Sequence, residues 1–391
     1  MRILLFSLLA LFLLTPASTF AKDEEAKTEE EEMSYPDRII EHISDANEFH
    51  LWGHTSIPLP CILYSFDDGL KMFWSNKFDH GHNAVHGYVM HHGDVMRIKD
   101  YTEDMHVEHI DEIKDKEVET AEGETVSKYY AVSHGEEYEL EKPSTLVKFT
   151  SWIDFSITKV VFTLLVAAIL MVLIFLAVAK GYRKREGQAP KGIQSLIEPL
   201  FVFMRDEVVE PAIGSRYERY MPFIMSLFFF ILITNFLGLI PFFPGSGNAT
   251  GNLGVTLALA LVTMIVVNFS GNKHYWQHIF WMPGVPVFVK LMLAPIEIAG
   301  IFIKPFTLLI RLFANMTAGH IIILSMVGMV FILGDNGESL SGATVGGVMA
   351  TLFVFALNLL ELLVAFIQAF LFALLSALYI GMAVEEHHEE H

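Results

Sequence analysis

Beyond Trp152 the chain consists mainly of apolar runs. Each run has about the length that a helix needs to cross a lipid bilayer, or is longer. These runs cover residues 155–179, 221–243, 253–269, 285–333 and 343–382. A helix needs about 20 predominantly apolar residues to cross the hydrocarbon core. We therefore predict that residues 152–384 form an all-α polytopic membrane domain with five membrane helical segments.

The first 150 residues are polar and acidic. Residues 1–21 contain one basic residue, a short apolar run and small residues at the end, which is typical of a cleaved secretory signal peptide. An uncleaved membrane helix is the alternative, but an apolar core of about a dozen residues is short for spanning. Residues 22–48 are an acidic segment, predicted to be flexible because it has little apolar surface to bury.

Residues 49–150 contain short β-branched and aromatic pieces separated by Gly, Pro, Asn and Asp, which predicts a small β-rich domain. Five histidines lie close together here: His80, His82, His86, His91 and His92. Imidazole binds zinc, copper and nickel, but the spacing matches no closed metal site, so we favour surface histidines. The chain contains one cysteine, Cys61, which excludes an intramolecular disulfide.

A basic cluster follows the first apolar run directly: Lys180, Arg183, Lys184 and Arg185. Such clusters mark the cytoplasmic side of a membrane. We therefore predict a multi-pass protein of a bacterial inner membrane with an external, periplasmic N-terminal domain. The acidic and His-containing tail at 385–391 is then cytoplasmic, and the mixed stretch at 192–214 is interpreted as a helix lying along the cytoplasmic face.

The last two apolar runs are about twice the length that a spanning helix needs. Tilt of ordinary size does not absorb such an excess. Either each run breaks into two helices, which Pro295 and Pro305 would permit, or the two runs form a long, steeply inclined hairpin. Such a hairpin would present one broad face to a curved partner.

These long runs carry polar residues that form a pattern. At about 100° per residue, Glu297, Lys304, Arg311 and Asn315 fall within roughly 40° of one another on a helix surface. Glu361 and Gln368 share a face, and His320 is half a revolution from Arg311. A permanent charge near the bilayer centre costs about 3 to over 10 kcal/mol. Asn315 or Gln368 alone is explained equally well as a satisfied bundle residue, but Arg311, His320 and Glu361 together indicate a proton or ion path.

The sequence RLFANMTAGH at 311–320 closely resembles the signature of subunit a of F-type ATP synthases. Further similar stretches are TNFLGLIP at 234–241, Glu297 with Lys304 and Pro305, and the segment from Glu361 through QAF at 368–370 to YIGMA at 379–383. The resemblance covers about residues 152–388. It does not cover residues 22–150, an extension that most relatives lack.

The resemblance implies a stator that faces a ring of c subunits, with two offset half-channels leading to opposite sides of the membrane. Arg311 matches the essential arginine, which attracts each ring carboxylate but does not itself take up or release the transported proton. His320 and Glu361 match the outer half-channel pair, here as histidine then acid. Asn235, Asn315 and Gln368 match polar channel or ring-facing positions, and Glu297 matches a position of the inner half-channel. An ion pair between Glu297 and Lys304 is the structural alternative.

The implied partners are the c-ring, the peripheral-stalk b subunits, the rest of the ATP synthase complex and membrane lipid, with no nucleic acid and no cofactor. The chain is expected not to be an enzyme by itself, because it has no phosphate loop or nucleophile triad. One alternative is a self-contained ion-coupled secondary transporter, although such folds usually show repeated halves and no repeat is visible here. The other is an envelope binding protein with a membrane anchor, which would not need Arg311, His320 and Glu361.

Overall fold

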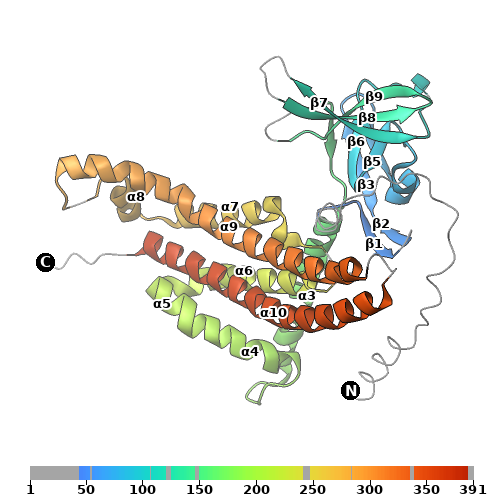
Figure 1. Ribbon diagram of the computed structural model, residues 1–391. Coiled ribbons are helices and arrows are strands. Elements are labelled where there is room, and N and C mark those ends of the chain that lie inside the picture. Colours follow the sequence, from blue (N-terminus) through green and yellow to red (C-terminus); the bar gives the residue numbers. More distant parts are fainter. Residues whose placement is uncertain are drawn as a thin grey trace. The chain divides into compact units, whose positions relative to one another are not determined.

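The computed structural model describes residues 44–52, 55–105, 107–119, 125–145, 149–240, 247–282, 284–334 and 339–385. The predicted signal peptide, most of the acidic segment and nearly all of the C-terminal tail lie outside these residues. A β-rich N-terminal region is followed by a helical region (Figure 1). Both parts of the predicted fold class are therefore present.

The N-terminal region contains three antiparallel sheets. One pairs β1 (Glu48–Trp52) with β2 (Thr55–Pro58), and a second has the order β10-β3-β4, from Trp152–Asp154, Pro60–Ser65 and Gly69–Trp74. The third has the order β5-β6-β9-β8-β7, from Tyr88–His91, Asp94–Ile98, Glu136–Glu141, Thr125–Ser133 and Glu112–Glu119. Short 3₁₀ helices cover Ser75–Gly81 and Glu103–Met105. We predicted that this domain ends at residue 150. Its last strand, β10, pairs with β3 and extends to Asp154.

Alternation along the strands explains how this region folds. In β3, Cys61, Leu63 and Ser65 are buried and the residues between them point outward, as expected for a strand with one face on a core. Trp152 of β10 is fully buried in the same core. Among the described residues, no group of three or more His, Cys, Asp or Glu side chains is placed to hold a metal ion.

The first membrane helix, α3 (Lys159–Lys184), begins where the sheet ends. Thr158 caps it by accepting from the backbone N–H of Val161, and the Asp45 carboxylate accepts from that of Val160. Next come α4 (Ile193–Phe203), a π-helix at Met204–Val209, α5 (Glu210–Ile213) and a 3₁₀ turn at Gly214–Arg216. The stretch interpreted as one surface helix is therefore a series of short helices.

Helix α6 (Tyr217–Gly238) is the centre of the helical core. Ile224, Phe228 and Ile231 are fully buried, and the core around them includes residues of α4, α9 and α10. After a 3₁₀ turn at Ala249–Gly251, α7 (Leu253–Ser270) is capped by Asn252 and α8 (Lys273–Phe280) by Asn272. These caps satisfy backbone N–H groups that a helix start leaves free.

The two long apolar runs form α9 (Val287–Leu333) and α10 (Leu340–Val384), which lie side by side (Figure 1). Helix α9 continues through Pro295 and Pro305, so the run does not break into two helices. Within the described part of the chain, four helical stretches are long and apolar enough to cross a membrane: Lys159–Lys184, Ile193–Gly238, Leu253–Ser270 and Thr344–Val384. Helix α9 is not among these four, so the count of five and the inclined hairpin remain predictions.

Candidate functional site

An ionisable pair joins α9 to α10. Nδ1 of His320 lies 2.9 Å from Oε1 of Glu361, within hydrogen-bonding distance. Only 16% of the His320 side chain and 5% of the Glu361 side chain are exposed. The structure therefore brings together the two residues that match the outer half-channel pair of the family that the sequence resembles.

The pair has further partners and one open position. Nε2 of His320 lies 3.3 Å from the carbonyl oxygen of Gly238, at the end of α6. The second carboxylate oxygen of Glu361 is buried and has no hydrogen-bond partner among the described residues. A Cβ atom on Gly319 would lie 2.6 Å from Oε1 of Glu361, so a side chain at this position would force the carboxylate to shift.

Asn235 lies one helical turn before Gly238 and is fully buried. Its amide nitrogen donates to the carbonyl of Ala365 on α10 at 3.1 Å, and its amide oxygen accepts from the hydroxyl of Thr250 at 2.8 Å. The structure therefore places this sequence-predicted channel residue in a link between α6, α10 and the turn before α7. This link lies beside the His320–Glu361 pair, and the Asn235 side chain is enclosed by protein instead of facing an open cavity.

Arg311 is partly buried on α9, and the described residues include no carboxylate that forms an ion pair with it. Asn315, one turn further, is exposed, whereas Gln368 on α10 is buried. The structure does not join these three predicted residues by hydrogen bonds within the described part of the chain. A permanent cation without a carboxylate partner among the described residues is available to a partner subunit that brings one.

Lys304, two turns before Arg311, does not pair with Glu297 within the described residues. Its amino group lies 5.4 Å from the centre of the Tyr379 ring, a cation–π arrangement. The charge of Arg311 also acts on Tyr379. Tyr379, which the sequence marked only as part of a stretch that resembles the family, is thus a further candidate residue beside Lys304.

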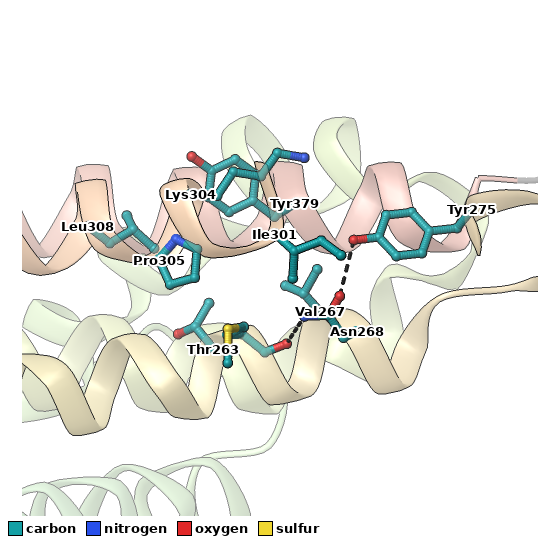
Figure 2. Close-up of a pocket in the computed structure, with 10 residues that line it drawn as sticks. Thr263, Val267, Asn268, Tyr275, Ile301, Lys304, Pro305, Leu308 and Tyr379 are labelled. Atoms are coloured by element: carbon teal, nitrogen blue, oxygen red, sulfur yellow. Dashed lines mark hydrogen bonds between the residues drawn. The ribbon is translucent and has the colours of Figure 1, made fainter. Parts of the chain in front are cut away.

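A small open pocket, with about 20 Å³ of space for water-sized molecules, lies between α7, α8, α9 and α10 near these residues (Figure 2). Its polar lining includes Lys304, Tyr379, Asn268 and Tyr275, and the Tyr275 hydroxyl lies 3.3 Å from Oδ1 of Asn268. Glu297, the sequence-predicted residue of the inner half-channel, is not among the residues that line this pocket. Asn268 and Tyr275 could not be predicted as site residues from the sequence, because they line the pocket only through the packing of α7 and α8 against α9.

The site therefore has two separate polar regions with Arg311 between them along α9. At 1.5 Å per residue, Arg311 is about 10 Å from Lys304 at the pocket and about 14 Å from His320 at the ionisable pair. Each region has groups that can exchange or orient protons: an imidazole with a carboxylate in one, and hydroxyl, amide and amino groups in the other.

Two family models match the chain. Residues 160–381 match the model described as ATP synthase A chain, and residues 38–121 match a domain of unknown function, DUF8433. A protein named ATP synthase subunit a from Chloroherpeton thalassium is 43% identical over 244 residues, covering 61% of this chain and 69% of the relative. ATP synthase subunit a 2 from Chlorobaculum tepidum is 44% identical over 61% of this chain and 66% of the relative. ATP synthase subunit a from Myxococcus xanthus is 40% identical over 61% and 77%.

Proposed function

Because the chain belongs to the ATP synthase A chain family, we propose that it is the stator subunit that carries protons to and from a rotating ring of c subunits. In this role it is a membrane component of the synthase and performs no ATP chemistry itself. The two half-channels, the essential arginine and the ring partner are the finer parts of the proposal. They rest on the chain's own residues as follows.

The observation that carries the proposal is the position of Arg311 between two polar regions on α9. A proton passing directly from one region to the other would have to pass this fixed cation, which repels it. A carboxylate on a moving ring would be attracted to the cation and held ionised there. Arginine suits this role because its pKa is too high for it to lose a proton. The guanidinium therefore blocks leakage while allowing the ring to turn.

The His320–Glu361 pair is the proposed proton relay of the outer half-channel. A neutral imidazole can take up a proton at one nitrogen and release one from the other, and its usual pKa lies near physiological pH. Here one nitrogen faces the Glu361 carboxylate and the other faces the Gly238 carbonyl. The unpartnered oxygen of Glu361 provides the next acceptor. Asn235 supports the pair by fixing α6 against α10.

The pocket beside Lys304 is the proposed inner half-channel. Its hydroxyl and amide groups can order water without adding negative charge. Glu297, on the same helix as Lys304, is proposed to deliver protons to it. Asn315, which is exposed one turn from Arg311, is proposed to face the ring carboxylates, and the buried Gln368 is proposed to line a channel. The b subunits of the peripheral stalk would hold the chain in place while the ring turns.

Orientation completes the proposal. The basic residues at the end of α3 support a cytoplasmic position for that end, with a periplasmic N-terminal domain and a cytoplasmic C-terminus. Membership of this family argues against a self-contained secondary transporter. It also argues against an envelope binding protein whose membrane part is merely an anchor.

The test is ATP-driven proton pumping and passive proton conductance in membrane vesicles that carry Arg311→Ala at equal assembly of the complex. We expect pumping to be lost while passive conductance is retained or increased. Arg311→Lys should also be inactive, because a desolvated lysine can lose its proton and lacks the fork of donors. Lys290→Ala is the matched control: this cation shares the helix face but lies over the ring of Trp281. Normal pumping by Arg311→Ala would refute the proposal.

A further inference from the structure

One face of the β10-β3-β4 sheet is apolar and uncovered. Its residues are Tyr64, Phe66, Leu70, Met72, Trp74 and Phe155, with exposed fractions between 37% and 66%. We call this set the apolar face. The opposite side of the same strands packs on a core through Cys61, Leu63 and Phe73. The sheet is thus apolar on both sides, whereas a sheet with one solvated side normally alternates apolar and polar residues.

The strand register shows that the apolar face is continuous. Leu70 of β4 pairs with Tyr64 of β3, and directly paired residues point to the same side of a sheet. Met72 and Trp74 follow on that side at intervals of two residues. The rings of Tyr64 and Phe66 contact each other edge to face, with centroids 5.7 Å apart. None of the six side chains is charged.

The chain connects this sheet to α3 without a free linker. The backbone N–H of Phe155 donates to the carbonyl of Ile62 and that of Ile157 to the carbonyl of Pro60. The next alternate residue, Lys159, is the first of α3, and its N–H donates to the carbonyl of Ala46. At about 3.3 Å per residue, Phe155 lies at most about 13 Å from the start of the spanning helix.

We propose that the apolar face rests in the membrane itself, in the polar–apolar boundary of the leaflet at the amino-terminal end of α3. Tryptophan and tyrosine gather at this boundary because their rings are amphipathic. The connection to α3 holds the sheet at the bilayer surface at all times. Exposed apolar patches of this kind mark interaction sites. Lipid is the partner that the short connection to α3 keeps close to the sheet. The inference needs α3 to span the membrane but does not depend on the role of Arg311.

The test uses the assembled complex in lipid nanodiscs with a nitroxide label at Met72→Cys. Burial raises the pKa of Cys61 to about 12, so its thiol stays protonated and only the new cysteine reacts. Collision of the label with oxygen, which partitions into lipid, is compared with collision with a water-soluble nickel chelate. The control is Lys77→Cys, an exposed position outside the apolar face.

We expect the ratio of oxygen to nickel collisions at residue 72 to exceed that at residue 77 several-fold. Labels at Leu70→Cys and Phe155→Cys should behave like residue 72, which guards against a local disturbance in one variant. Equal ratios at residues 72 and 77 would mean that the face is in water and would overturn the proposal. Protection of residue 72 from both reagents would also overturn it, because a protein partner would then cover the face.

Discussion

Replacing Gly319 with alanine should slow proton transfer through the His320–Glu361 pair. The added Cβ would lie 2.6 Å from Oε1 of Glu361, far inside normal contact distance. The carboxylate must retreat by about 0.6 Å, which stretches its 2.9 Å contact with His320 toward the limit of a hydrogen bond. The surroundings resist this movement because Glu361 is buried between two helices.

The expected magnitude follows from that contact. Losing a hydrogen bond to a charged group costs about 1.5–3 kcal/mol. Since about 1.4 kcal/mol corresponds to a factor of ten in rate, we expect the step carried by this pair to slow by about 10- to 100-fold. The measurement is the rate of ATP-driven proton pumping in vesicles, normalised to the amount of assembled complex.

Gly300→Ala, on the same helix, is the matched control, because a Cβ at that position meets no atom within 4 Å. It should pump normally, and alanine should slightly favour the helix. The double variant Gly319→Ala with Glu361→Gln should pump no more slowly than Glu361→Gln alone, because both changes act on one interaction. Equal pumping by Gly319→Ala and Gly300→Ala would refute the reasoning.

Three further predictions concern stability. Asn235→Ala should destabilise the helical core by about 2 kcal/mol, because it removes two buried side-chain hydrogen bonds and leaves the Thr250 hydroxyl without its acceptor. Thermal denaturation of the solubilised complex would show this, with Asn358→Ala as a control whose side chain bonds only within α10. Arg97→Met should cost the N-terminal domain about 2 kcal/mol, less than breaking a fully buried pair, because Asp68 is 33% exposed. Amide hydrogen exchange of β6 in the full chain would report it, and unchanged protection would contradict the estimate. Burial raises the pKa of Asp154, so the folded protein binds this proton more tightly than the unfolded chain. Asp154→Asn keeps an oxygen for the N–H of Ser156 and should therefore slow exchange in β3 at pH 7. The gain should vanish as the pH falls to the ordinary pKa of aspartate, and a gain that persists there would exclude the ionisation explanation.

Much of the helical architecture could be predicted because hydropathy and helix periodicity are local properties. The apolar runs at 253–269, 285–333 and 343–382 agree with α7, α9 and α10 to within three residues. The stripe through Glu297, Lys304 and Arg311 follows from about 3.6 residues per turn alone. The start of α3 was less predictable, since Phe155 and Ile157 are apolar but extend the sheet.

The candidate site shows where local information ends. The resemblance paired His320 with Glu361, but the hydrogen bond between them depends on how α9 and α10 are rotated against each other. The same is true of Lys304, which lies over Tyr379 rather than pairing with Glu297. Packing of side chains from several helices sets these rotations, and no single helix encodes them.

The sequence by itself determined that this chain has membrane-length apolar helices, a β-rich N-terminal region and a permanent cation at Arg311 in an apolar segment. These properties depend on residues close together in the chain. Only the tertiary structure decided that Gly319 makes room for Glu361, that Asn235 fastens α6 to α10, and that the apolar face of β3 and β4 is uncovered. These features depend on contacts between segments far apart in sequence, where small shifts in packing decide which groups meet.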